Sequence, residues 1–195
     1  MQVLALLGSP RKKGNSDLLA DEVLKGAKSV GALVDKIYLD DFHIRPIGEV
    51  VDDSRNREDL RADDDYPQLL NKFLESDLII WASPLYWHGV SAQMKCFIDR
   101  FSSYFNNPRY ADRFNSKGHI ILCTFGRDDY EHSRFITEPM KLTIQVLRGN
   151  YIGDICVPAC YQKGKILEKK DELLKAYNLG RKAVKLLEDK KSHEK

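Results

Sequence analysis

The stretch that decides the fold is VLALLGSPRKKGNSD, which runs from Val3 to Asp17. Its first five residues are apolar without interruption, and Gly8-Ser9-Pro10 then ends the run, as is typical of a buried strand followed by a turn. From Ser16 onward, apolar residues recur at helical spacing until Gly31, a residue that favours the end of a helix. The stretch therefore predicts a strand, a loop and a helix in direct succession.

Similar units follow along the rest of the chain. Four further strand-like runs are Leu33–Leu39, Leu78–Ala82, His119–Thr124 and Ile152–Val157. Helical patterns cover 66–74, 90–101, 132–148 and 166–189, with Asp65 as a candidate cap for the first and Pro139 as a candidate kink in the third. Strands that alternate with helices favour a parallel α/β sheet. Five such strands are the inventory of a flavodoxin-like three-layer sandwich with strand order 2-1-3-4-5.

We expect the whole chain, 1–195, to form a single domain. It is 43% hydrophobic and 31% charged, which is ordinary globular usage, and it contains no internal repeat or low-complexity linker. Two segments stand apart. A charged connection over 40–65 is longer than loops usually are, and is either a solvated excursion or a lid or subunit contact. A charged tail over 188–195 is expected to be a solvated, fraying end.

Composition excludes several classes of function. Lys and Arg number 31 against 29 Asp and Glu, and this balance argues against a nucleic-acid partner. No apolar run approaches the roughly 18 residues of a membrane-spanning helix. Met1 leads into the first strand without the basic segment and cleavage site of a signal peptide, so we expect a cytoplasmic protein. The four cysteines form no C-x-x-C pair, which favours a reducing compartment and gives no disulfide framework.

In a sheet of this order, ligands bind at the carboxyl ends of the strands near the point where strand order reverses, so the loops after the first, third and fourth strands form the candidate site. The first loop, Gly8 to Asp17, combines hydroxyls, positive charge and the free N–H groups of a helix N-terminus, which together suit a phosphate monoester. It has neither the Gly-Lys-Ser/Thr of a Walker loop nor the G-x-G-x-x-G of a dinucleotide site. We therefore predict a phosphate site here, with an ordinary basic turn as the alternative.

The other two loops supply surface for a flat ligand. After the third strand, Leu85, Tyr86 and Trp87 lie in a loop, where a planar aromatic ligand would cover them unless they pack on the neighbouring helix. After the fourth strand, residues 124–130 offer a hydroxyl, backbone N–H groups at a glycine and a cation. The loops together predict a pocket with a phosphate end and an aromatic end.

Three motifs carry a family resemblance: G-S-P-R-x-x-G-N-S at 8–16, S-P-x-Y at 83–86 and K-x-F-x-D-R at 95–100. In this order, and with a match over nearly the whole chain, they resemble the NADPH-dependent FMN reductase and multimeric flavodoxin-like family, whose iron–sulfur flavoprotein branch is nearest in layout. The resemblance implies non-covalent FMN. The implied FMN contacts are Ser9, Pro10, Arg11, Gly14, Asn15 and Ser16 around the phosphate, Pro84, Leu85, Tyr86 and Trp87 against the ring, and Thr124, Phe125, Gly126 and Arg127 at its other edge.

One feature of the iron–sulfur branch is missing. That branch carries a compact cysteine motif after the second strand, whereas residues 42–48 here read FHIRPIG. Because a cluster needs thiolate ligands, we expect none. No His, Asp, Glu or Cys grouping has metal-ligand spacing either, so we expect no metal site.

The resemblance implies an NAD(P)H-dependent FMN-containing oxidoreductase. NADPH or NADH would pass a hydride to the flavin and leave, and a quinone, a nitro- or azo-aromatic compound or free flavin would then take the electrons in a ping-pong cycle. Since the flavin carries the chemistry, we assign no catalytic residue. The N–H groups at Phe125 and Gly126, with Arg127 nearby, are expected to stabilise negative charge on the reduced ring. Lys95 and Arg100 are expected to form structural ion pairs on the helix or between subunits, with contact to a nicotinamide phosphate as the alternative.

Two other classes of function stay open. One is a flavodoxin-type electron carrier reduced by a protein partner; the near-neutral charge counts against it, since such carriers tend to be strongly acidic. The other is a binding module that kept the fold and lost the flavin. The resemblance also implies a homodimer or homotetramer. Several aromatic residues could cover either a subunit surface or the chain's own core: Phe101, Tyr104, Phe105, Tyr110 and Phe114.

Overall fold

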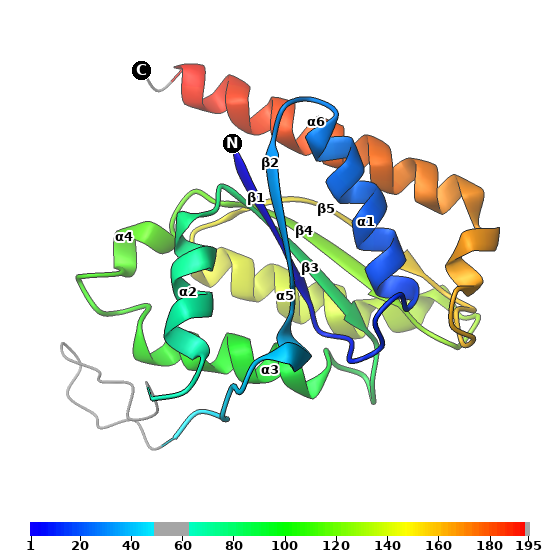
Figure 1. The fold of residues 1–195 in the computed structure, drawn as a ribbon, viewed down its shortest axis with the longest axis horizontal. Helices are drawn as coiled ribbons and strands as arrows, with labels where there is room; N and C mark the ends of the chain where they lie inside the picture. Colours follow the sequence, from blue (N-terminus) through cyan, green and yellow to red (C-terminus); the bar gives the residue numbers. More distant parts are fainter. Residues whose placement is uncertain (49–62, 194–195) are drawn as a thin grey trace.

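The computed structural model describes residues 1–48 and 63–193, and a five-stranded parallel sheet lies at its centre. The strands are β1 (Gln2–Leu7), β2 (Leu33–Tyr38), β3 (Leu78–Pro84), β4 (Gly118–Thr124) and β5 (Asn150–Val157). The α-helices are α1 (Asn15–Lys28), α2 (Tyr66–Glu75), α3 (Ala92–Asp99), α4 (Ala111–Phe114), α5 (Arg134–Val146) and α6 (Lys170–His193). Short 3₁₀ turns are η1 (Leu39–Asp41), η2 (Arg100–Ser103), η3 (Tyr130–Ser133) and η4 (Lys165–Glu168). The strands pair in the order β2-β1-β3-β4-β5, which confirms the predicted flavodoxin-like sheet (Figure 1).

Helices cover both faces of this sheet. The helices α1 and α6 lie on one face, and α2, α3 and α5 lie on the other (Figure 1). Each face of the sheet has its own hydrophobic core, and the side chains of β1 alternate between them. Val3, Ala5 and Leu7 pack in the core under α1 and α6, and Leu4 and Leu6 pack in the core under α2, α3 and α5. Because both faces are buried, the strand is apolar at every position from Val3 to Leu7, which is why the sequence alone reveals it.

Two glycines allow α1 and α6 to approach each other closely. A Cβ atom at Gly26 would lie 1.9 Å from the carbonyl oxygen of Tyr177, and one at Gly180 would lie 2.0 Å from that of Val23. Any side chain at either position would push the helices apart. The contact fixes the axis of α1, whose first turn is part of the candidate site.

The aromatic residues after α3 pack into the chain's own core. Phe101, Tyr104 and Phe114 are buried, and Phe105 and Tyr110 pack against the same cluster. Phe73 of α2 lies at the centre, with its ring centroid 5.0 Å from that of Phe101 and 5.6 Å from that of Phe114. Of the two roles open to these residues, the structure therefore shows the core.

Lys95 and Arg100 form ion pairs within the chain, as expected. Lys95 pairs with Asp99 one turn along α3. The fully buried Arg100 guanidinium lies 2.7 Å from Asp64 and stacks over the Tyr66 ring, 4.4 Å from its centroid. Burial raises the pKa of the Asp64 carboxyl, but hydrogen bonds from Arg100 and from two backbone N–H groups outweigh it, so this pKa is lower than usual.

Two local predictions can be compared with the structure. Asp65 is the N-cap residue of α2, as predicted, but its side chain makes no capping hydrogen bond; the carboxylate accepts hydrogen bonds from the His43 N–H at 2.7 Å and from Gln68 at 2.8 Å. Residues 188–193 continue α6, where residues 188–192 are exposed and Lys191 pairs with Asp77 at 2.6 Å, so the fraying of 188–195 stays a prediction. Most of the charged connection over 40–65 lies outside the described residues, so its role as a lid or contact stays a prediction.

Candidate functional site

A cavity of about 250 Å³ opens at the carboxyl edge of the sheet. Four loops line it, each following a different strand: those after β1, β3 and β4, as predicted, and the one after β5. The lining residues are Ser9, Arg11, Gly14, Asn15 and Ser16; Pro84, Leu85 and Tyr86; Thr124, Phe125 and Gly126; and Cys160, Tyr161 and Lys163. Pro10, Trp87 and Arg127, which the sequence also indicated, do not line the cavity and are exposed.

The loop after β1 forms an end of the cavity suited to an anion. The helix α1 begins at Asn15 with Gly14 as its N-cap residue, so the first N–H groups of the helix and the positive end of its dipole face this end. Ser9 and Ser16 are buried beside it, and the Ser9 hydroxyl accepts a hydrogen bond from the Arg11 N–H at 3.1 Å. The loop is thus folded back on itself and presents backbone donors.

The acidic residue of this turn is neutralised by the protein. Asp17 is buried, pairs with Lys36 at 2.5 Å and accepts hydrogen bonds from the Tyr38 hydroxyl at 2.9 Å and the Lys13 N–H at 2.6 Å. Burial lowers the pKa of Lys36, but its hydrogen bonds to Asp17 and Asp21 outweigh this, and the pKa is raised. The carboxylate next to the anion end is therefore matched by a firmly protonated lysine.

Asn15 serves a purpose that its sequence position did not reveal. Its amide nitrogen donates to the carbonyl oxygens of Cys160 and Gln162, both at 2.8 Å, and its amide oxygen accepts from the Ile166 N–H at 3.1 Å. These bonds tie the Asn15 side chain to the segment after β5 and use both of its polar atoms. What Asn15 can offer a phosphate is its backbone N–H at the helix start.

The loop after β3 supplies the apolar wall. Pro84, Leu85 and Tyr86 line the cavity, and the Leu85 N–H donates to Thr124 at 3.1 Å. Tyr86 and Gly89 then close a tight turn through two backbone hydrogen bonds of 3.0 and 3.1 Å. Trp87 and His88 occupy its centre with φ of 47° and 62°, and Trp87 is 98% exposed. The turn directs Trp87 into solvent.

The loop after β4 contributes through its backbone. The Phe125 N–H donates to the Val157 carbonyl at 3.2 Å, and the Phe125 ring is buried, so this residue contributes to the cavity wall without offering its N–H to a ligand. The Thr124 side chain is buried at the cavity wall. Among the described residues, the Gly126 N–H has no backbone partner, so it is the donor left for a ligand's ring edge.

The residues after β5 were missed from sequence. Cys160, Tyr161 and Lys163 line the cavity, whereas the sequence prediction covered only the loops after the first, third and fourth strands. Two signals were available: the loop also follows a parallel strand, and it ends at Gly164, which has φ of 81° and precedes η4.

The charge of the cavity suits a phosphate. Arg11 and Lys163 both line it, and within residues 1–48 and 63–193 neither forms an ion pair with an acidic side chain. A helix N-terminus with two cations at one end of the cavity, and apolar side chains on its wall, are features that suit an aromatic ligand with a phosphate group.

Other sites are weaker candidates. A larger depression of about 890 Å³ is lined by α6 alone and lies away from the four loops. The described residues contain no group of three or more His, Cys, Asp or Glu side chains placed to hold a metal ion. In the same part of the chain, no helix combines the length and apolar character needed to cross a membrane.

A parallel sheet of this order with an anion-suited cavity at its carboxyl edge defines a flavodoxin-like protein. The chain belongs to the NADPH-dependent FMN reductase family, which residues 1–133 match. This confirms the resemblance drawn from the three motifs. The family consists of oxidoreductases that use FMN, with NAD(P)H as the electron donor.

Individual proteins show the same relationship. A putative NAD(P)H-dependent FMN-containing oxidoreductase, YwqN of Bacillus subtilis, is 32% identical over 120 residues, which cover 57% of this chain and 58% of the relative. An iron–sulfur flavoprotein of Archaeoglobus fulgidus is 30% identical over 190 residues, which cover 97% of this chain and 82% of the relative. Among solved structures, a flavone reductase shares the fold with a TM-score of 0.72 at 22% identity, covering 98% of this chain and 64% of that one.

Proposed function

We propose that this chain is an NAD(P)H-dependent, FMN-containing oxidoreductase that passes electrons to a small aromatic acceptor: a quinone, a nitro- or azo-aromatic compound or free flavin. Family membership supports the class of reaction and the cofactor. The observation that carries the proposal is the cavity, which has Arg11 and the start of α1 at one end and Leu85 and Tyr86 on its wall.

Each part of the cavity has a task in this function. The phosphate would be held by Arg11 and by N–H groups at the start of α1, where negative charge is favoured. Pro84, Leu85 and Tyr86 would contact the ring, and the Gly126 N–H would donate to its edge. Bound FMN would supply the hydride-transfer chemistry, while the protein positions it and excludes water from one side.

The size of the cavity bears on access. At about 250 Å³ it lies near the lower end of the volumes of ligand pockets, and it is open to solvent. Part of the ring would therefore stay at the surface, where a nicotinamide or an acceptor can reach it. A site shared in turn by donor and acceptor supports a ping-pong cycle.

We further propose a cytoplasmic homodimer or homotetramer without nucleic-acid or membrane partners. Two large apolar side chains on α5, Leu142 and Val146, are 63% and 60% exposed in the single chain, which supports a subunit contact there. Light scattering or sedimentation of the purified protein measures the subunit count directly.

The function is tested by the visible spectrum of the purified protein during anaerobic addition of NADPH and then NADH. We expect paired flavin bands that bleach with a pyridine nucleotide and return when a quinone is added. Bands that bleach only with dithionite would support the electron carrier instead. A colourless protein that FMN cannot reconstitute would refute both.

A matched pair of variants links the spectrum to the cavity. Arg11→Gln should lower FMN occupancy, because it removes a cation from the anion end. Lys12→Gln is the control, since Lys12 neighbours Arg11 but pairs with Asp41 at 2.7 Å and does not line the cavity. Equal FMN occupancy in the two variants would argue against the assigned phosphate end.

A further inference from the structure

The loop after β5, residues 158–164, is fixed against both ends of the candidate site. At one end the Ala159 N–H donates to the Arg127 carbonyl and the Cys160 N–H to the Phe125 carbonyl, both at 2.7 Å. At the other end the Asn15 amide holds the carbonyl oxygens of Cys160 and Gln162 at 2.8 Å. A surface loop tied to two other loops of one cavity is a built part of that cavity.

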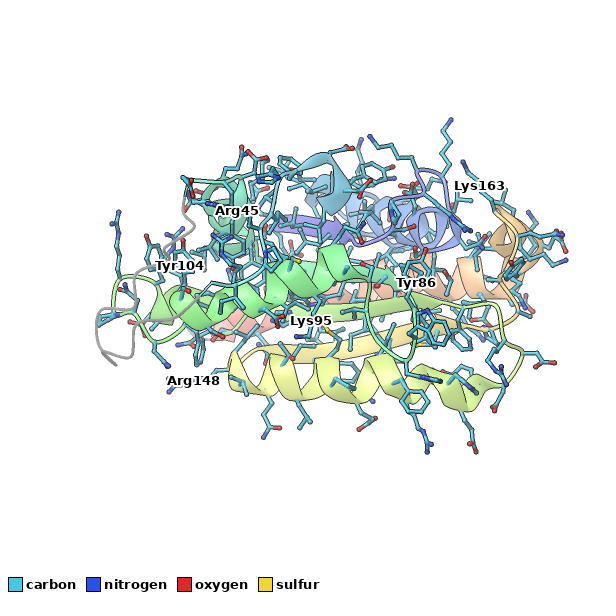
Figure 2. All side chains as sticks on the ribbon, turned by 90° about the horizontal axis from the view of Figure 1, so that it is seen from below. Arg45, Tyr86, Lys95, Tyr104, Arg148 and Lys163 are labelled. Carbon is cyan, nitrogen blue, oxygen red and sulfur yellow. The ribbon has the colours of Figure 1, made fainter. Side chains whose placement is uncertain are left out.

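These contacts place two side chains at different points along the cavity. The Tyr161 ring lies against Gly126, where a Cβ atom would be 3.0 Å from Tyr161 Cδ2, so Tyr161 is on the ring side. Lys163 follows Gln162, which is bonded to Asn15 at the start of α1, so Lys163 is on the phosphate side. Lys163 and Tyr86 lie toward the same end of the molecule, opposite Arg45, Tyr104 and Arg148 (Figure 2).

Neither side chain is explained by the packing of the chain itself. Tyr161 is 83% exposed although its backbone is held in place. Within the described residues Lys163 has no acidic partner, whereas Lys165, two residues on, pairs with Glu168 at 2.6 Å. An exposed aromatic ring and an unpaired cation beside one cavity indicate a ligand that is flat at one end and anionic at the other.

We propose that the loop after β5 is a fourth wall of the FMN site. Lys163 shares the phosphate with Arg11, Tyr161 covers the edge of the ring next to Gly126, and Asn15 is a positioning residue that holds this wall against the phosphate loop. The inference rests on the proposed function. A phosphate monoester carries between one and two negative charges near neutral pH, so a second cation next to Arg11 adds to the stabilisation of that charge.

The test compares FMN with riboflavin, which has the same ring but no phosphate. The dissociation constants of both flavins are measured by fluorescence quenching on the flavin-free protein, its Lys163→Gln variant and its Lys165→Gln variant. Lys163→Gln should weaken FMN binding by about tenfold or more, the size of a lost charge-assisted hydrogen bond, and leave riboflavin binding unchanged. Lys165→Gln should change neither, because Lys165 is paired outside the cavity.

Two further variants test the other assignments. Tyr161→Ala should weaken FMN and riboflavin equally, by about threefold to tenfold, because it removes a ring contact and no charge. In an Asn15→Ala background, Lys163→Gln should lose most of its effect on FMN binding, a coupling that a purely structural role of Asn15 would not produce. Thermal unfolding confirms that each variant is folded.

The outcomes separate the two proposals. If the unchanged protein binds neither flavin, the proposed function and this inference both fail. If it binds FMN but Lys163→Gln binds it equally well, or if Lys163→Gln weakens riboflavin as much as FMN, only the fourth wall is overturned.

Discussion

His119 gives the protein a pH-dependent stability of calculable size. The side chain lies in β4 within the core beneath α5, and its Nδ1 accepts a hydrogen bond from Trp81 Nε1 at 3.1 Å. Among the described residues, its buried Nε2 has no hydrogen-bond partner. Burial, with a smaller contribution from the charge of Lys117, lowers the pKa of His119 to about 3. The His119 imidazole is therefore neutral in the folded protein near neutral pH.

The lowered pKa sets the sign and window of the effect. The unfolded chain protonates His119 near its ordinary pKa of about 6.5, whereas the folded chain does not protonate it until near 3. Acidification below about pH 6.5 therefore favours the unfolded state. Between about pH 7 and pH 5 the free energy of unfolding should fall by about 2 kcal/mol on account of this group alone. For a chain of this size, that lowers Tm by about 4–8 °C.

Urea unfolding at pH 7 and pH 5 measures the difference. His119→Asn keeps an acceptor for Trp81 at the position of Nδ1 but cannot titrate. The loss of unfolding free energy between pH 7 and pH 5 should therefore be about 2 kcal/mol smaller in this variant than in the unchanged protein. His132→Asn is the control, because His132 is only partly buried and contacts Asp129 at 3.4 Å. Equal pH dependence in the unchanged protein and in His119→Asn would refute a buried neutral His119.

Three other substitutions follow from single contacts, and thermal unfolding measures each. Trp87→Asn should raise Tm by about 2–4 °C, because asparagine tolerates the positive φ at this exposed position better than tryptophan does; an unchanged Tm would mean that the turn is not strained. Gly180→Ala should lower the free energy of unfolding by about 1–3 kcal/mol, because it forces α6 away from α1. Asn178→Ala, on the exposed side of α6, is the control and should leave stability unchanged; equal effects of the two variants would contradict the close approach of the helices. Asp64→Ala should cost about 3–5 kcal/mol, since it leaves Arg100 buried without its carboxylate, and a loss below about 1 kcal/mol would argue against the buried pair.

The sheet could be predicted from sequence because its signals are local. The inner strands β1, β3 and β4 are buried on both faces and so are apolar along most of their length, and the longer helices show their own period. Side-chain partners were harder to predict. Asp65 is at the N-cap position, but its carboxylate accepts hydrogen bonds from the His43 N–H and the Gln68 side chain instead of capping the helix. Near the end of α6, Lys191 pairs with Asp77, which lies 114 positions earlier in the sequence.

The candidate site was predictable to the extent that it follows from strand order. Three loops were located because the carboxyl ends of neighbouring strands share an edge. Which atoms of those loops are available to a ligand depends on contacts between loops. The Asn15 side chain is taken by residues 160–166, and the Phe125 N–H by Val157, and neither partnership leaves a mark near those residues in the sequence. The same contacts bring Lys163 to the cavity.

Most of the backbone strain in the described residues lies in the loops of the cavity. Of six non-glycine residues with positive φ, four occur in three of its four loops: Lys13 after β1, Trp87 and His88 after β3, and Ala159 after β5; the other two, Ser116 and Arg148, lie elsewhere. Each costs on the order of 1 kcal/mol or more, and such conformations persist only where surrounding contacts impose them. Here the contacts are the Asp17 bond to the Lys13 N–H, the Tyr86 bridge and the Arg127 bond to Ala159. Because these bonds are made between protein groups, they fix the shape of the loops, and fewer backbone conformations remain to be ordered when a ligand binds.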